Sequence, residues 1–369
     1  MNNRNIQTYF DCGHSKIRAG VFIDSIQFYE FYSESRFLLN QPNLSDEIHN
    51  VITSLEKNSN EYIDNINLMI DSSKMISIGI SISKKFDGST LKQTDVKFLI
   101  QEAKQQISKN YKHQYIAHII INNYKINEVD YTTLPKDPKC FLISLDIIFI
   151  CLPNDMVLDL KNIFSKFNIS INQIICSSYA KSINYKKNLN LTGNIAFIDI
   201  GFNKTSIISF HDDRFLSLDI LHIGGNHITK DISKILNIEN EQSESIKMQI
   251  IKNLESKKTV DFSNEKTQKI VLARVEEILE LSIKSIKSNS FKSIPFKIFL
   301  TGNGSKALKN IHKDEILIFE NLEILEETTK SICQSGLELG MGLNKQEVVI
   351  VPKKQIKQGF FEKLFHFFS

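Results

Sequence analysis

Residues 195–210 read IAFIDIGFNKTSIISF, two apolar runs joined by a short polar turn. The β-branched and aromatic residues predict strands over Ile195–Ile200 and Thr205–Phe210. Asp199 stands at the end of the first strand and Gly201 opens the turn, so the backbone amides there can point at a ligand. A third strand is expected at Phe215–His222, directly after this hairpin.

The beginning of the chain repeats this pattern. Residues 6–22 read IQTYFDCGHSKIRAGVF, which predicts strands over Ile6–Phe10 and Ile17–Phe22 with a turn between them. Asp11 and Gly13 hold the same places as the aspartate and glycine of the later hairpin. Internal repetition of this kind predicts two related domains that face a common cleft.

A different pattern separates the two hairpins. Strand-like runs at Ile76–Ile82 and Ile116–Ile121 flank a helical stretch at Thr94–Tyr111, and a further strand is expected at Cys140–Leu152. We interpret this region as a small α+β module of its own. After the second hairpin, three helices and a strand are expected, at Gly225–Leu236, Glu241–Lys252, Lys266–Ser288 and Phe296–Leu300.

Composition excludes several classes of protein. Lysine and arginine number 45 against 42 acidic residues, a net charge of +3, so the strongly basic face of a nucleic-acid-binding protein is not expected. The five cysteines form no CxxC pair and are interpreted as reduced, mostly buried thiols of a cytoplasmic protein. The longest apolar stretch, Cys140–Leu152, is shorter than the roughly 20 residues that a membrane span needs.

The paired Asp-x-Gly turns carry the sharpest chemical signal. A strand-end carboxylate can hold Mg²⁺ through water, and the amides beside it can cradle phosphates, so two facing turns would clamp a nucleotide. The candidate metal ligands are Asp11 and Asp199. Such turns also simply close hairpins. A third glycine-rich turn at Gly302–Gly304 favours the nucleotide interpretation for the set.

Two further strings fit the same ligand. Gly224 and Gly225 lead from a strand into a helix, where unpaired amides favour an anion, although a plain strand-to-helix turn looks the same. Glu244 and Lys247, one helical turn apart, could reach a ribose or base. The alternative for this second pair is an exposed intrahelical charge pair.

The C-terminus predicts an amphipathic helix. At about 100° per residue, its apolar side chains fall within an arc of about 160°; they are Phe360, Phe361, Leu364, Phe365, Phe367 and Phe368. Lys353, Lys354 and Lys357 precede them. Five phenylalanines behind a basic flank favour an interfacial membrane anchor, with a terminal helix docked on the core as the alternative.

Taken in order, these strings resemble the FtsA family of bacterial cell-division proteins, within the actin and heat-shock-chaperone ATPase superfamily. The resemblance is carried by Asp199-Ile-Gly201, the IGGNHITKDI run at 223–232, Ser243–Lys247, the Leu300–Gly304 turn and Gly340-Met-Gly342. It extends nearly from end to end. It implies an α/β, actin-like two-domain ATPase fold with an inserted α+β subdomain (1C) and a C-terminal amphipathic helix.

The resemblance also implies a division into subdomains. We expect 1A at 1–75 and 153–193, 1C at 76–152, 2A at 194–225 and 296–343, 2B at 226–295, a flexible linker at 344–357 and the membrane-targeting helix at 358–369. It implies ATP with Mg²⁺ in the cleft. The residues that match the nucleotide site are Asp11, Gly13, His14, Ser15, Lys16, Asp199, Gly201, Asn203, Lys204, Thr205, Gly224, Gly225, Glu244, Lys247, Gly302, Asn303 and Gly304.

The partners implied are those of a membrane adaptor. A protein of this family grips the C-terminal peptide of FtsZ, polymerises as an actin-like filament, recruits other divisome proteins and binds lipid peripherally. Its place is the cytoplasmic face of the inner membrane at the division site. Arg274, with Glu277, is the candidate contact to the FtsZ peptide, which is acidic in the family.

This sequence departs from the family in its second turn. Phe202 and Asn203 replace two glycines, and Ser206 replaces a closing carboxylate. Phenylalanine tolerates a positive φ poorly, so the turn is expected to bind phosphate weakly, with Lys204 supplying a compensating charge. His14 and Asn303 are milder departures. We therefore expect at most a weak ATPase, or a pseudo-ATPase scaffold with no catalytic residues.

Two alternatives remain open at the level of sequence. One is a pilus-type actin-like assembly protein, which shares the inserted module. The other is an active ATP-dependent enzyme of the same superfamily, such as a sugar kinase.

Overall fold

Two five-stranded sheets of one topology form the two lobes of the computed structural model, which describes residues 5–34, 43–256, 262–289, 295–308, 322–342 and 346–348. The first sheet has the order β3-β2-β1-β4-β9, and its strands are β1 (Ile6–Cys12), β2 (Ile17–Ile23), β3 (Gln27–Ser33), β4 (Asn65–Met69) and β9 (Ser170–Ile175). The second has the order β12-β11-β10-β13-β14, from β10 (Ile195–Ile200), β11 (Thr205–His211), β12 (Arg214–Leu221), β13 (Lys297–Thr301) and β14 (Leu322–Ile324).

The pairing is the same in both sheets. In each, a central strand (β1 or β10) pairs antiparallel with the next strand of a hairpin and parallel with a later strand (β4 or β13). A second parallel strand completes each sheet. The duplication predicted from the two Asp-x-Gly turns is therefore confirmed in the topology. It brings the carboxyl ends of β1 and β10 to corresponding places in the two lobes.

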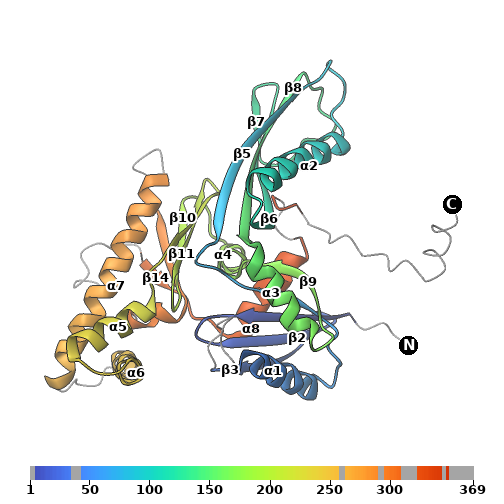
Figure 1. Cartoon of the computed structure of the whole chain (residues 1–369). Helices are drawn as coiled ribbons and strands as arrows, with labels where there is room; N and C mark the ends of the chain where they lie inside the picture. The colour runs from blue at the N-terminus through green and yellow to red at the C-terminus, as the bar shows by residue number, and fades with distance from the viewer. Residues whose placement is uncertain are drawn as a thin grey trace.

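Helices cover both sheets (Figure 1). The first sheet packs with α1 (Leu44–Ser59), α3 (Asn154–Ser165), α4 (Ser177–Asn188) and α8 (Thr329–Gly340). The second sheet carries α5 (Gly225–Leu236), α6 (Asn240–Ser256), α7 (Phe262–Asn289) and the short 3₁₀ helix η1 (Asn303–Leu308) on its outer side.

Strand β10 packs on both of its faces, one against the first lobe and the other against α5 and α7. Successive side chains of a strand point to opposite faces. Ile195 and Phe197 pack into the core that the first lobe shares, whereas Ala196, Ile198 and Ile200 pack with α5 and α7. A strand that is apolar on both faces is buried on both, so β10 lies in the middle of the molecule.

The structure places α8 with the first lobe, although residues 296–343 were expected in the second. Ile332, Cys333 and Leu337 are buried in the first-lobe core, and α8 packs against β1, β2 and β3. The approach is close, because a Cβ on Gly336 would lie 2.6 Å from the Tyr9 ring. The helix therefore returns the chain from the second lobe to the first.

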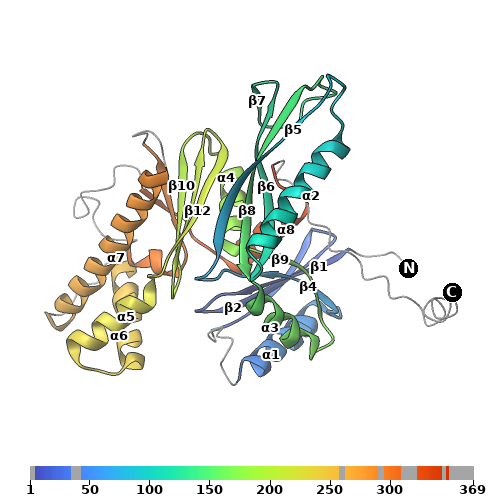
Figure 2. The same cartoon turned by 45° about the horizontal axis from the view of Figure 1, so that its top comes forward.

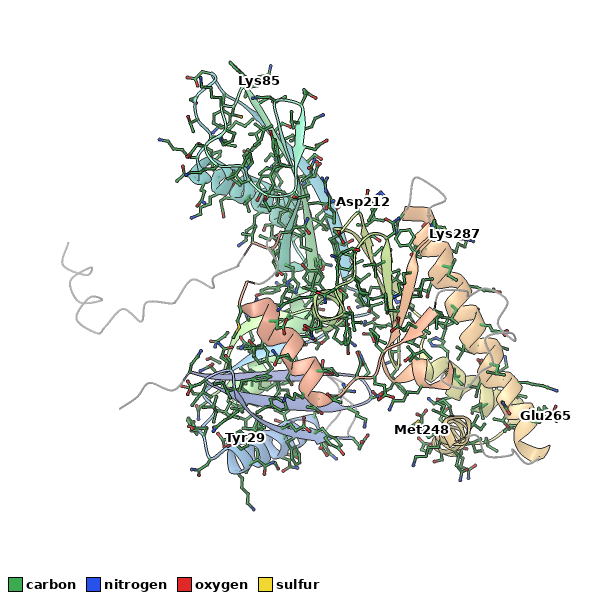
Figure 3. All side chains as sticks on the ribbon, turned by 180° about the vertical axis from the view of Figure 1, so that it is seen from behind. Tyr29, Lys85, Asp212, Met248, Glu265 and Lys287 are labelled. Atoms are coloured by element: carbon green, nitrogen blue, oxygen red, sulfur yellow. The ribbon has the colours of Figure 1, made fainter. Side chains whose placement is uncertain are left out.

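The inserted module forms a third sheet of its own. Its elements are β5 (Ile76–Lys85), α2 (Gln93–Asn110), β6 (Gln114–Ile126), β7 (Val129–Tyr131) and β8 (Leu142–Pro153), with strand order β5-β8-β6-β7. One face packs on α2 in a separate core. This sheet projects from the first lobe beside the second (Figure 2). Lys85 marks its far end, and Lys287 lies towards one end of α7 (Figure 3).

Residues 346–348 pair with β6. The amide of Ile121 donates to the carbonyl of Gln346 at 2.7 Å, and the amide of Val348 donates to the carbonyl of Ile119 at 2.8 Å. These residues lie within the expected linker, and Glu347 also reaches the buried His118, whose Nδ1 lies 2.6 Å from Oε1 of the glutamate. The predicted amphipathic helix, 358–369, lies outside the described residues.

All five cysteines are buried and free, as predicted. Among the residues that the structure describes, no helix is long and apolar enough to cross a membrane.

Candidate functional site

The two Asp-x-Gly turns have the same geometry. In each, the amide of the glycine donates to the carbonyl three residues later, from Gly13 to Lys16 at 3.0 Å and from Gly201 to Lys204 at 2.9 Å. Each turn thus spans four residues at the end of its central strand. Both turns line one cleft between the lobes.

A third turn closes the cleft from the second lobe. Gly302 has a φ of +82°, and a Cβ there would lie 2.4 Å from Oδ1 of Asp199. Glycine is required on both counts, the backbone conformation and the close approach. From the same turn, the side-chain amide of Asn303 donates to Oγ of Ser15 at 3.3 Å, a contact between the two lobes.

The Asp11 carboxylate at the end of β1 has partners at both oxygens. Arg18, opposite it on β2, donates to Oδ2 at 2.9 Å, and the hydroxyl of Ser177 donates to Oδ1 at 2.7 Å. Asp11 is 5% exposed, so its charge needs compensation within the protein. Arg18 supplies it.

The corresponding carboxylate of the second lobe, Asp199, is paired with a lysine. Lys181 extends from α4, and its ammonium lies 2.9 Å from Oδ2 of Asp199 and 2.9 Å from Oε1 of Glu327. Glu327, just before α8, also accepts from the amide of Gly302 at 3.2 Å. All three charged side chains are at least 89% buried.

A third ion pair crosses between the lobes. Lys204, in the second turn, places its ammonium 3.1 Å from Oδ2 of Asp71, which follows β4 of the first sheet. The backbone amides in the first turn of a helix have no acceptor within the helix. At the start of α4, the amide of Ser178 donates to both carboxylate oxygens of Asp71, at 3.3 and 3.2 Å. Asp71 therefore fills the anion-binding end of α4.

These pairs set the pKa values of the cleft. Burial opposes the ionisation of Asp199, but Lys181 and then Lys204 outweigh it and hold its pKa below the ordinary value. Burial raises the pKa of Glu327, against the pull of Lys181. Burial also opposes the charge on Lys181, yet Asp199 and Glu327 raise its pKa well above the ordinary value. Lys181 is therefore a permanent cation.

His14, at the tip of the first turn, faces the same charges. Burial lowers its pKa, the nearby Lys204 lowers it further, and Asp71 acts in the opposite direction. The imidazole is therefore neutral at neutral pH. Both His14 and Lys204 line the cleft, so the first and second turns face each other there.

A second group of expected residues lies behind the second turn. The amides of Gly225 and Asn226 donate to the carbonyls of Gly201 and Phe202 at 2.9 and 2.7 Å. The hydroxyl of Thr205 donates to the carbonyl of Ile223. Backbone hydrogen bonds thus join the start of α5 to the second turn, residues 201–204. Gly224 also packs closely against the second turn, because a Cβ there would lie 2.6 Å from the carbonyl oxygen of Gly201.

Lys247 completes this second group. Its ammonium donates to Glu244 at 2.8 Å, to Thr229 at 2.9 Å and to the carbonyl of Gly225 at 3.1 Å, and it lies 5.5 Å from the Phe202 ring centre. The lysine is 4% exposed. The expected pair Glu244 and Lys247 is therefore largely buried, and the alternative of an exposed surface pair is wrong.

Phe202 and Asn203 fit the second turn without backbone strain. Neither is among the non-glycine residues with positive φ in the described part of the chain. The expected penalty for replacing the family's glycines is therefore absent. The Phe202 side chain instead lines the cleft beside Asn203.

Most, but not all, of the expected nucleotide residues line the cleft. Ten do: Asp11, Gly13, His14, Ser15, Asp199, Gly201, Asn203, Lys204, Gly302 and Asn303. Lys16 does not, since its ammonium pairs with Glu34 at 2.6 Å and lies over the Tyr32 ring. Gly304 instead packs against Ile200.

The expected partner and membrane residues lie elsewhere. Arg274 on α7 makes two bonds to Asp231 of α5, at 2.6 and 2.9 Å, and also contacts Glu277. Phe360, Phe361, Leu364, Phe365, Phe367 and Phe368 lie outside the described residues.

The sequence alone did not point to four charged residues of the cleft. These are Arg18, Asp71, Lys181 and Glu327. Arg18 could have been found, because the hairpin register places it opposite Asp11. Asp71 follows β4, a strand that was not predicted. The cleft that all these groups line has a volume of about 90 Å³.

Sequence comparison identifies the relatives of this chain. The family model described as Cell division protein FtsA matches residues 196–317. The Cell division protein FtsA of Bacillus subtilis (strain 168) is 26% identical over 231 residues, 58% of this chain and 51% of that protein. The FtsA of Buchnera aphidicola subsp. Acyrthosiphon pisum is 22% identical over 351 residues, 83% of this chain and 82% of that protein.

The chain is similar to FtsA proteins. The resemblance inferred from the two turns and the strings after them is thereby confirmed. A further FtsA, from Agrobacterium fabrum, is 20% identical over 274 residues. The matched parts span 51% and 61% of the length of the Bacillus and Agrobacterium FtsA proteins.

Solved structures agree on the fold. The PilM-PilN type IV pilus biogenesis complex matches with a TM-score of 0.63 at 12% identity, covering 93% of this chain and 99% of that one. The ethanolamine utilization protein EutJ from Carboxydothermus hydrogenoformans matches with a TM-score of 0.53 at 10% identity, covering 91% and 89%. At such identities the likeness concerns the fold alone. The expected actin-like ATPase fold is confirmed.

Proposed function

We propose that this chain is an actin-like membrane adaptor of bacterial cell division, which tethers FtsZ filaments to the cytoplasmic membrane and recruits later division proteins. The observation that carries the proposal is the FtsA match over residues 196–317. This segment includes the second turn, the start of α5 and Arg274. The work of such a protein is binding and assembly, with catalysis secondary.

Binding to FtsZ and to lipid would each be weak for one copy. A single short amphipathic helix holds a membrane only marginally. An actin-like filament presents many helices and many FtsZ sites at once, and avidity then multiplies two weak contacts into a firm one. The predicted division into subdomains assigns the FtsZ contact to the lobe that carries α5, α6 and α7, and the lipid contact to 358–369.

The cleft is proposed as a nucleotide site with weak or no turnover. Facing turns of identical geometry support ATP as the ligand. Its volume of about 90 Å³ is well below the roughly 300 Å³ of an ordinary small-molecule pocket. ATP would therefore enter only when the lobes separate. Weak binding follows, because the ion pair between Lys204 and Asp71 must break first.

The residues present do not fit Mg²⁺. Both expected ligands, Asp11 and Asp199, already pair with buried cations. Within the described ranges, no group of three or more histidine, cysteine, aspartate and glutamate side chains could hold a metal ion. No step of the proposed function is assigned to a metal.

Reconstitution on a supported bilayer of anionic lipid tests the adaptor function. The full chain should recruit fluorescent FtsZ filaments to the bilayer. The variant Phe361→Ser/Phe365→Ser should lose both membrane binding and recruitment, since it breaks the apolar face of the predicted helix. Arg274→Ala should lose FtsZ recruitment and keep membrane binding.

Lys284→Ala is the matched control for Arg274→Ala. Lys284 is an exposed cation on the same helix, α7, so a general charge effect would appear in both variants. Equal recruitment by Arg274→Ala and the parent chain would remove Arg274 from the contact. Membrane binding without any FtsZ recruitment would reject the adaptor and favour the pilus-type alternative, whose fold is shared.

A further inference from the structure

The ammonium of Lys181 lies between two buried acidic groups, Asp199 and Glu327. It lies 2.9 Å from Asp199 and 2.9 Å from Glu327. Both distances are those of charge-assisted hydrogen bonds. The other Asp199 oxygen, Oδ1, faces Gly302 so closely that even a methyl group would not fit between them. Little of the Asp199 carboxylate is left for a metal.

A divalent ion would also have to displace Lys181. Mg²⁺ prefers six oxygen ligands at 2.0–2.1 Å, and Oδ2 of Asp199 and Oε1 of Glu327 each already lie 2.9 Å from the lysine ammonium. Lys181 cannot easily withdraw, because α4 is packed in the core and the lysine is 7% exposed.

The first lobe shows the same arrangement with another residue. Arg18 neutralises Asp11 as Lys181 neutralises Asp199, and Lys204 neutralises Asp71 between the lobes. Three built-in cations thus face the strand-end acids from β2, α4 and the second turn. In a nucleotide site of this geometry, the charge that a metal supplies is already present in the side chains.

We propose that Lys181 is the resident cation of the cleft, and that it replaces a divalent metal between Asp199 and Glu327. The cleft then takes a phosphate-bearing ligand without Mg²⁺. Only the identity of that ligand, a nucleotide, rests on the function proposed above. The replacement of the metal rests on the positions of the three side chains.

Electron paramagnetic resonance of Mn²⁺ tests the metal directly, with no nucleotide present. The free ion gives a signal that falls when protein binds it. The full chain should leave that signal unchanged. Lys181→Met removes the ammonium and keeps the stem, so it should bind about one Mn²⁺ per chain, and adding Asp199→Asn should abolish the new site.

Lys187→Met is the matched control, because Lys187 lies on the same helix with its side chain 52% exposed. It should behave as the parent chain. Binding of Mn²⁺ by the parent chain, lost on Asp199→Asn, would overturn the proposal. The comparison of the parent chain with Asp199→Asn decides the proposal even if Lys181→Met does not fold, since it needs only the parent chain and a single isosteric change.

Calorimetric titration of ATP into the full chain separates this proposal from the nucleotide function. The dissociation constant should agree within about twofold between Mg²⁺ and EDTA. A tenfold or larger loss in EDTA would overturn the resident cation. If ATP fails to bind under both conditions, the nucleotide function fails, and the Mn²⁺ measurement still decides the role of Lys181.

Discussion

Lys204 and Asp71 show how one ion pair can set the state of a cleft. Their side chains are 7% and 10% exposed, and they come from different lobes. A buried charge without its partner is costly, typically by about 3 kcal/mol or more. The pair therefore stabilises the closed arrangement, and any anion that enters the cleft competes with Asp71 for Lys204.

Asp71→Asn should separate stability from ligand affinity. The change leaves Lys204 with the hydroxyl of Ser206 as its remaining described partner, so the free energy of unfolding should fall by about 3 kcal/mol. The released ammonium can then face a phosphate, and ATP should bind about tenfold more tightly. Denaturant melts and calorimetric titration measure the two effects.

Asp212→Asn is the control for that change. Asp212 is 78% exposed and has a φ of 47°, which asparagine adopts easily. It should alter neither stability nor ATP affinity. If Asp71→Asn weakened ATP binding, Asp71 would be a ligand-supporting group rather than a competitor, and the account of the closed cleft would fail.

The sequence predicts some of these residues and misses others for a physical reason. Asp11 and Asp199 stand at the ends of apolar strands and are visible as a repeated pattern. Lys181 looks like any polar residue of a helix, because its burial depends on α8 and β10 lying beside it. Contacts between elements distant in the chain leave no local trace in sequence.

The same limit appears at the scale of elements. The strands of the two hairpins and the helices α2, α5, α6 and α7 were predicted within a few residues, because long apolar patterns decide them. Strand β4 was missed. Its residues, NINLM, alternate asparagine with apolar side chains, and asparagine is depleted in strands. Tertiary pairing with β1 and β9 overrides that preference and places β4 inside the first sheet, between these two strands.

The turn at Gly302 allows a test of how tightly the third turn packs against Asp199. Gly302→Ala should destabilise the protein by about 3 kcal/mol, from a positive φ that costs about 1 kcal/mol and overpacking that costs about 2 kcal/mol. The added methyl would sit 2.4 Å from Asp199. Chemical denaturation measures the loss.

Gly193→Ala isolates the backbone part of that cost. Its φ is +85°, close to that of Gly302, but a Cβ there would meet no atom within 4 Å. It should cost only about 1 kcal/mol. A Cβ on Gly302 would also lie 2.5 Å from the carbonyl oxygen of Ile200. Equal losses for the two variants would mean that both groups give way to the methyl group, and the tight packing of the third turn would be disproved.

At the scale of the whole molecule, His118 joins three parts of the chain. It lies on β6 of the inserted sheet and is fully buried. Its Nε2 accepts from the amide of Cys176 at 2.9 Å, so Nδ1 carries the hydrogen and donates to Glu347 at 2.6 Å. The inserted sheet, the start of α4 and residues 346–348 therefore meet at one imidazole.

His118→Ala should release residues 346–348 from β6. The variant loses a buried partner of Glu347, and the free energy of unfolding should fall by about 3 kcal/mol. Hydrogen exchange gives the local measure. The Val348 amide, which donates to Ile119, should lose its protection before the amides of β1 and β10 do, because the opening is local. His113→Ala, an exposed histidine at the start of β6, should change neither.

Glu347→Gln distinguishes the charge of this contact from its hydrogen bond. A glutamine can still accept from Nδ1 of His118, so a neutral contact predicts a loss of only about 1 kcal/mol. A loss as large as that of His118→Ala would mean that the negative charge of Glu347, and not its hydrogen bond alone, is responsible for the contact. Unchanged hydrogen exchange of the Val348 amide in His118→Ala would show that the backbone bonds to β6 are enough to hold residues 346–348. The side-chain contact between His118 and Glu347 would then have no role in holding this segment.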